Sequence, residues 1–262
     1  MVIMCGTGKR GFKRMNISLV TSFYKGYDRF LDQWLSAVSS STELPDEIII
    51  GVSGDGYDPT NVQKAEERLS EVQHQIVYFP HVSMGQARNE AVKAASGNWI
   101  MYLNVDDEIT PNAMHDIRQN LSEEMDILTG SMEWCGHPKK SGIRKYEITE
   151  ESIISGGITN DHSIYRRSIW ELSPYIEYSG DVDMAFWLGL VQAGAKIKCV
   201  DAVLTKHYFR PDSVFGKYSK EDMQEIRRQM AIWRKEGVHS ERFNTPEYKS
   251  KGDYGFKHHT GG

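Results

Sequence analysis

The chain has 262 residues, which is enough for one α/β domain with a substantial core, or for such a domain with a small appendage. Its 31 basic and 36 acidic residues give a formal net charge of −5, which disfavours a protein that coats nucleic acid and predicts no large nucleic-acid surface. Hydrophobic residues make up 39% and charged residues 26%, a balance typical of a soluble globular protein and unlike that of a disordered chain or a membrane protein.

The three cysteines are odd in number and widely spaced, at Cys5, Cys135 and Cys199. This spacing indicates neither a disulfide framework nor a paired-cysteine zinc site. No run approaches the roughly 18 apolar residues that a transmembrane helix needs, and residues 1–15 lack the apolar core of a secretion signal. We therefore expect a cytoplasmic protein with no transmembrane segment, in which residues 1–15 form a flexible leader.

The first half of the chain alternates between strand and helix patterns. Strands are expected over 17–23, 47–52, 75–79 and 99–103, and helices over 30–38, 62–72 and 85–96. This alternation predicts right-handed βαβ units and a mostly parallel sheet. Ligands of such sheets bind outside the carboxyl ends of the strands, which directs attention to residues 21–24, 53–55 and 104–107.

The second half is less periodic. Strands are expected over 125–135, 143–146, 197–200 and 203–207, and helices over 166–172, 183–193 and 220–236. A polar tail follows from residue 237.

Asp106 and Asp107 follow a buried strand together with Asn104. Unpaired carboxylates are costly near a core, so these acids need a cation or hydrogen-bond donors. The alternative is that they cap a helix ahead of Pro111 and occupy its first turn.

Three segments in register resemble the family 2 glycosyltransferases of the GT-A fold. They are the helix that begins Gly85-Gln86-Ala87-Arg88-Asn89, the strand after Gly97, and the segment Leu103-Asn104-Val105-Asp106-Asp107. The resemblance covers about residues 16–214. It implies an α/β fold of GT-A type, a single domain with a Rossmann-like, mostly parallel central sheet flanked by helices. It also implies a nucleotide-sugar-binding half over 16–108 and an acceptor-binding half over 109–214, followed by a C-terminal helix over 215–236 and a polar tail over 237–262.

The activity implied is an inverting, metal-dependent transfer of a sugar from a nucleotide-diphosphate donor, a UDP-sugar first of all, to an acceptor hydroxyl. The pathway implied is glycan or cell-surface polysaccharide biosynthesis. Mn²⁺ or Mg²⁺ would neutralise the leaving diphosphate. The resemblance makes Asp106 the first metal ligand and His207 a second, and an imidazole ligand favours Mn²⁺. Asp183 falls at the position of the catalytic base that takes the acceptor proton.

The remaining site residues also come from the resemblance. Donor-binding positions are Thr21, Phe23, Tyr24, Ser53, Asp55, Arg88, Asn104 and Val105. Acceptor or secondary positions are Asp107, Asp181 and Arg210.

Two positions depart from the family pattern. Val52 and Ser53 stand where the family usually has an Asp pair, one member of which contacts uracil, so selectivity for uridine stays open. Asn104 replaces the first Asp of the metal motif, which keeps hydrogen bonds but removes a charge. We expect activity to survive, because the later Asp is the typical ligand of the family.

Other interpretations stay open. Asp181 and Asp183 could simply be first-turn acids that offset a helix dipole, and His207 could be a hydrogen-bonded structural residue. A sugar-1-phosphate nucleotidyltransferase and a non-catalytic nucleotide-sugar-binding scaffold are the alternative functions. The acceptor could be a glycan, a lipid-linked sugar or another hydroxyl compound, and an oligomer is possible.

Overall fold

The parallel part of the sheet is built from the first half of the chain. The computed structural model describes residues 15–137, 139, 141–146, 148–154, 160–177, 182–210 and 219–239. β1 (Ile17–Tyr24) lies between β2 (Glu47–Ser53) and β4 (Trp99–Tyr102), and β3 (His74–Phe79) lies beyond β2. All four strands are parallel, so their carboxyl ends meet at one edge.

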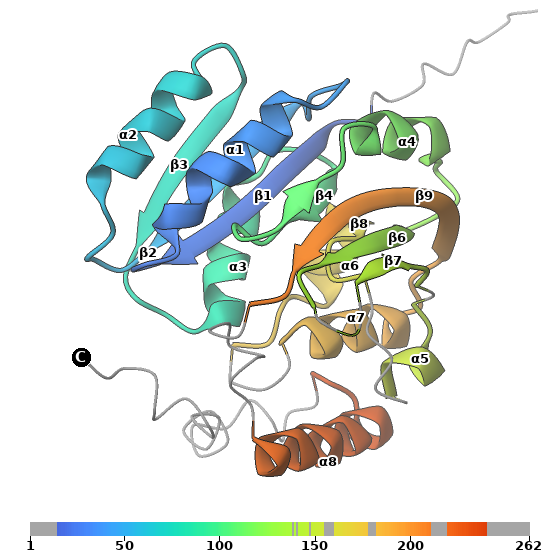
Figure 1. Cartoon of the computed structure of the whole chain (residues 1–262). Coiled ribbons are helices and arrows are strands. Elements are labelled where there is room, and N and C mark those ends of the chain that lie inside the picture. Colours follow the sequence, from blue (N-terminus) through green and yellow to red (C-terminus); the bar gives the residue numbers. More distant parts are fainter. Residues whose placement is uncertain are drawn as a thin grey trace, which may run out of the picture.

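Beyond β4 the sheet becomes mixed. The strand order is β3-β2-β1-β4-β8-β6-β9-β5 (Figure 1). The short strand β7 pairs with the carboxyl-terminal part of β6. The strands concerned are β5 (Glu108–Ile109), β6 (Ile127–Cys135), β7 (Gly142–Arg144), β8 (Ile164–Arg166) and β9 (Ile197–Tyr208). Because β8 is antiparallel to both β4 and β6, β6 and its parallel neighbour β9 run in the same direction as the first four strands.

Helices cover both faces of the sheet and bury two hydrophobic clusters against it (Figure 1). One face carries the 3₁₀ turn η1 (Asp28–Phe30), α1 (Leu31–Ser39), α2 (Pro59–Arg68) and α4 (Ala113–Asn120). The other carries α3 (Met84–Ala94), α5 (Glu150–Ile154), α6 (Arg167–Leu172) and α7 (Val182–Gln192), and α8 (Lys220–Glu236) packs against α5 and α7. The fold is therefore a three-layer α/β/α arrangement, as predicted.

Local sequence explains where the helix that carries Arg88 begins. The side chain of Ser83 caps α3 by accepting a hydrogen bond from the Gln86 amide at 3.3 Å. A Cβ atom at Gly85 would lie 1.7 Å from the carbonyl oxygen of Ile176. Only glycine therefore lets the start of α3 approach the segment before α7 this closely.

The predicted elements are largely confirmed, with differences at element ends and in the second half. The helix expected over 62–72 spans Pro59–Arg68. The two strands expected over 197–200 and 203–207 are one strand, β9, because its irregular pairing with β6 absorbs three additional residues without a break. The short elements β5, α4, α5 and β8 were not predicted. Among the described residues, no helix is both long and apolar enough to span a bilayer.

Candidate active site

Arg88 lies buried beneath the site. It projects from α3, is 3% exposed, and donates to both carboxylate oxygens of Asp183, with Nη2 3.2 Å from Oδ2. Its guanidinium also lies 4.8 Å from the ring centre of Tyr102 and 5.3 Å from that of Tyr175. Burial favours the neutral form, but the charge of Asp183 raises the pKa of Arg88 well above its ordinary value, so this guanidinium stays charged.

Asp183 lies in the first turn of α7, above Arg88. Its side chain is 23% exposed, so part of the carboxylate faces outward while the rest is held by the guanidinium. Asp183 is therefore fixed in orientation and still reachable by a ligand. Asp181, a secondary position in the sequence prediction, lies outside the described residues.

Asp107 is buried in a ring of donors. Its side chain is 1% exposed and accepts hydrogen bonds from Asn104 Nδ2 at 3.3 Å, His207 Nδ1 at 3.2 Å and the Tyr208 amide at 3.0 Å. His162 Nε2 lies 3.2 Å from the same carboxylate. Burial alone would raise the pKa of Asp107, but the imidazoles of His162 and His207 hold it well below the ordinary range. Asp107 is therefore a buried anion that orients its neighbours.

His207 lies at the end of β9 and is about one-third exposed. Because Nδ1 faces Asp107, Nε2 is the nitrogen available to a ligand or a metal ion. Its ring packs 5.2 Å from the indole of Trp134. Burial lowers the pKa of His207, but hydrogen bonding to Asp107 outweighs this effect and raises the pKa to about 9.

Asp106 is the more accessible of the two adjacent acids, with an 18% exposed side chain. Arg210 donates to its carbonyl oxygen at 2.8 Å and places Nε 3.7 Å from its carboxylate, while the guanidinium packs 4.1 Å above the Phe30 ring. Burial, and next the charge of Asp107, raise the pKa of Asp106 to about 6. A cation would favour the ionised form of such a carboxyl group.

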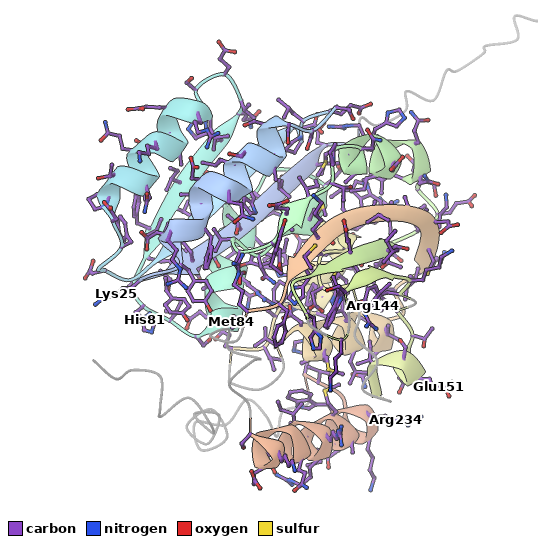
Figure 2. The ribbon with its side chains drawn as sticks, in the orientation of Figure 1. Lys25, His81, Met84, Arg144, Glu151 and Arg234 are labelled. Carbon is purple, nitrogen blue, oxygen red and sulfur yellow. The ribbon has the colours of Figure 1, made fainter. Side chains whose placement is uncertain are left out.

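The expected donor-side residues divide between surface and core. Tyr24 is 39% exposed, beside the rings of Tyr27 at 4.8 Å and His81 at 6.3 Å. His81 lies with Lys25 and Met84 at the edge where β1 and β2 end (Figure 2). Asp55 is exposed.

Of the other expected donor-side residues, Asn104 is half-buried and five are buried, namely Thr21, Phe23, Ser53, Arg88 and Val105. Phe23 packs in the core beside Tyr57, and the Ser53 hydroxyl accepts from the Val82 amide at 3.4 Å. Their side chains build the floor of this edge, while Tyr24 and Asp55 are open to a ligand.

Three residues near the site were not predicted, namely Tyr102, His162 and Tyr175. Tyr102 lies within a predicted strand, but its pairing with Val20 of β1, which brings its hydroxyl 2.6 Å from that of Ser22, depends on a strand register that the sequence does not show. His162 and Tyr175 come from irregular segments, which carry no periodic signal in the sequence.

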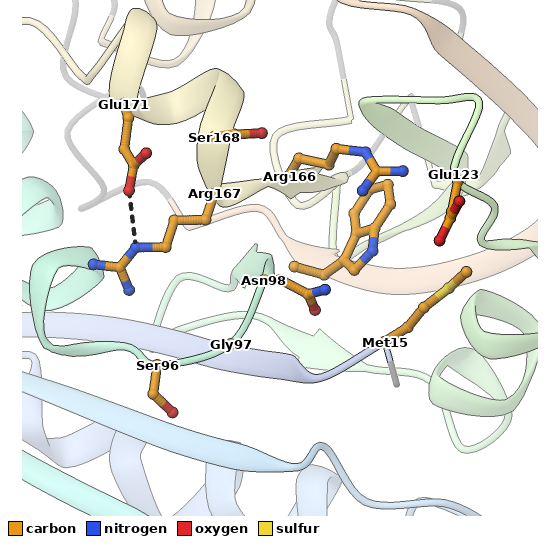
Figure 3. A pocket seen from close by; sticks show the side chains of 10 residues that line it. Met15, Ser96, Gly97, Asn98, Glu123, Arg166, Arg167, Ser168 and Glu171 are labelled. Carbon is orange, nitrogen blue, oxygen red and sulfur yellow. Dashed lines mark hydrogen bonds and ion pairs between the residues drawn. The ribbon is translucent and has the colours of Figure 1, made fainter. Parts of the chain in front are cut away.

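Two hollows of the described surface lie away from this edge. One of them, with a volume of about 500 Å³, is lined by residues at the amino ends of β1 and β4, among them Gly97, Asn98 and Arg166 (Figure 3). Arg166 is already bound to the carbonyl oxygens of Met125 and Ser122 at 2.6 and 2.8 Å.

The family model described as glycosyl transferase family 2 matches residues 18–171, which is more than half of the chain. The chain belongs to this family. It is a glycosyltransferase with the GT-A fold. No curated protein is significantly similar to it in sequence.

Solved structures similar to this glycosyltransferase include those of Staphylococcus aureus TarS. TarS 1–349 superposes with a TM-score of 0.62 at 18% identity, over 91% of this chain and 68% of that one. Its complex with UDP-GlcNAc gives a TM-score of 0.65 at 18% identity, over 91% and 70%. A longer TarS structure gives 0.63 at 17% identity, and only 42% of that chain is covered. At such identities the likeness shows the shared fold.

Proposed function

We propose that this glycosyltransferase moves a sugar from a UDP-sugar to an acceptor hydroxyl, with inversion and with the help of a divalent cation. The observation that carries the proposal is the pair of charged arrangements at one sheet edge, with Asp183 held by Arg88 and His207 held by Asp107. The TarS structures in complex with UDP-GlcNAc and UDP support a uridine donor, because they share this fold.

The base in this proposal is Asp183. Its outward-facing carboxylate takes the proton of the acceptor hydroxyl as the oxygen forms a bond to the anomeric carbon. The bond from that carbon to the diphosphate breaks, and its electron pair leaves with UDP. A single direct displacement inverts the anomeric centre. Arg88 holds the carboxylate in place and is not itself exposed to the donor.

The leaving diphosphate develops negative charge beside Asp106 and His207. Among the described residues, no group of three or more His, Cys, Asp or Glu side chains is arranged so that it could hold a metal ion by itself. The donor set fits a cation shared with the diphosphate once His207 releases its Nε2 proton, since Asp106 offers a carboxylate and Asp107 orients the imidazole. A bound Mn²⁺ or Mg²⁺ would act there as a Lewis acid. Arg210 adds a fixed positive charge next to Asp106.

Nucleobase contact is assigned to the exposed face of Tyr24, with Asp55 as a second candidate because it follows the end of the neighbouring strand β2. Acceptor chemistry is proposed only as a hydroxyl compound, either a glycan or a lipid-linked sugar.

The test is a thermal-shift measurement with UDP, GDP and UMP, each with and without Mn²⁺. A ligand that binds only the native protein increases the free energy of unfolding, by about 2.7 kcal/mol at a concentration of 100 times Kd, and so raises the melting temperature. UDP with Mn²⁺ should give the largest shift, and the protein should then slowly hydrolyse a UDP-sugar in the absence of acceptor. A larger shift with GDP would contradict the uridine assignment, and equal shifts with and without Mn²⁺ would contradict the cation.

A further inference from the structure

Asn104 lies between the two charged arrangements of the site. Its Oδ1 accepts a hydrogen bond from Arg88 Nη2 at 3.2 Å, and its Nδ2 donates to Asp107 Oδ2 at 3.3 Å. Arg88 in turn holds Asp183, and Asp107 holds His207. A continuous series of hydrogen bonds therefore runs from Asp183 to His207, and Asn104 is its central member.

An amide side chain at this position can keep both hydrogen bonds, one to Arg88 and one to Asp107. A guanidinium has donors and no acceptor, whereas an ionised carboxylate has acceptors and no donor. The central residue must therefore accept on the side of Arg88 and donate on the side of Asp107. An aspartate, which the family pattern has at this position, would accept from Arg88 but would turn an oxygen toward Asp107. It would also compete with Asp183 for the guanidinium.

Both neighbours of Asn104 are deeply buried, with Arg88 3% and Asp107 2% exposed. Hydrogen bonds between buried charged groups and an amide are stronger than those at a surface, and the unmatched group left by their removal is costly. The amide thus restrains two charges that cannot find water as a replacement partner.

We propose that Asn104 is a positioning residue that fixes the base Asp183 relative to His207. This inference rests on the proposed function, because it assigns the acceptor side of the reaction to Asp183 and the diphosphate side to His207. Each arrangement keeps its own contacts when Asn104 is changed. Loss of the amide therefore misaligns the two sides without removing either, and such misalignment slows the chemical step more than it weakens binding.

The test uses Asn104→Asp, which keeps the acceptor and loses the donor, and Asn104→Leu, which loses both. The matched control is Asn98→Asp, at the opposite edge of the sheet, where the substituted side chain still accepts from the Asn16 amide. For each protein we would measure the Kd for UDP with Mn²⁺ by calorimetry, the melting temperature, and kcat and KM for the UDP-sugar that the unmodified protein hydrolyses.

Both Asn104 variants should lose about tenfold or more in kcat while the Kd for UDP changes by less than about threefold. The control should match the unmodified protein. A large increase in Kd with kcat preserved at saturation would overturn the proposal in favour of a direct donor contact. Wild-type kcat in Asn104→Asp would also overturn it, as would loss of the thermal transition in both variants, which would make Asn104 a folding residue.

Failure of the inference differs from failure of the proposed function. If the unmodified protein binds UDP with Mn²⁺ and hydrolyses a UDP-sugar, but the Asn104 variants behave as it does, only the positioning role is wrong. If the unmodified protein and Asn98→Asp bind no UDP, the proposed function and the inference built on it are both wrong.

Discussion

Asp183 combines restraint and access, which are the two properties that a catalytic base needs. Two donors of Arg88 hold its carboxylate, and the tyrosine rings around the guanidinium keep that partner from moving. The Asp183 side chain is still 23% exposed, so a ligand can reach it while Arg88 holds it.

Replacing Asp183 with Asn should therefore abolish proton removal while leaving donor binding. We expect Asp183→Asn to lower kcat for transfer by about 10² to 10⁴-fold, because a positioned general base contributes that much. The Kd for UDP with Mn²⁺, measured by calorimetry, should change little. Asp201→Asn is the control, since Asp201 is an exposed acid paired only with Lys145 in the described structure. Transfer at the unmodified rate in Asp183→Asn would remove the base assignment.

At the scale of single residues, sequence reasoning found those that stand in a recognisable pattern. Asp106, Asp183 and His207 were predicted as site residues, and the structure brings them to one region. Sequence reasoning could not identify the buried side chains that contact these three residues and hold them in place. Arg88 was assigned to the donor, yet its burial beneath Asp183 depends on α3 meeting the segment before α7, a tertiary contact with no trace in local periodicity.

Elements of the first half are joined by a buried carboxylate at the edge opposite the site. Glu47, at the start of β2, accepts from Ser18 Oγ of β1 at 2.6 Å and from the amide and hydroxyl of Ser96 at 2.7 and 2.9 Å. Burial would raise the pKa of Glu47, but these hydrogen bonds outweigh it and lower the pKa below its ordinary value. Glu47 thus links β1, β2 and the turn between α3 and β4.

Glu47→Gln should destabilise the fold by about 1 to 3 kcal/mol at pH 7, as expected for lost charge-assisted hydrogen bonds. Because the pKa is lowered in the folded state, this contribution is fully present above the ordinary value of 4.5 and is lost as the pH falls through the folded-state pKa. Urea unfolding at several pH values should show the difference between the two proteins shrinking below about pH 4.5. Exposed Glu66→Gln is the control, and a difference independent of pH would rule out the charged form as its cause.

Prediction at the scale of elements succeeded where strands and helices alternate with regular apolar spacing. It failed for β5, β8 and α5, which are two to five residues long and too short to establish a period, and also for α4, which has eight residues. These short elements matter for the site. β5 directly follows the two acids and pairs with β9, so it brings Asp107 beside His207.

At the scale of the whole molecule, α8, the C-terminal helix that the sequence predicts after residue 214, contributes side chains to the core of the domain. Met230 and Trp233 are 3% and 1% exposed and lie in the same cluster as Trp187 of α7. The side-chain amide of Gln192 donates a hydrogen bond from Nε2 to the Trp233 carbonyl oxygen at 3.0 Å.

Trp233→Ala should therefore cost about 3 to 5 kcal/mol, the usual range for a buried aromatic side chain. For a chain of this size the melting temperature should fall by roughly 10 °C, measured by calorimetry. Lys235→Ala, on the exposed side of α8, should leave it unchanged. An unchanged melting temperature in Trp233→Ala would show that α8 contributes nothing to the stability of the core.

The irregular pairing of β9 has a consequence for which mutations the gene can tolerate. Between Ile197 and Tyr208 the strand uses three more residues than β6 does between its paired positions, Ile127 and Cys135. Side chains alternate between the faces of a strand, so the number of residues in this stretch decides which face His207 occupies. Substitutions at the exposed positions Cys199 and Asp201 leave that number unchanged. Deletion of a single codon in this stretch would shift the register and turn His207 away from Asp107.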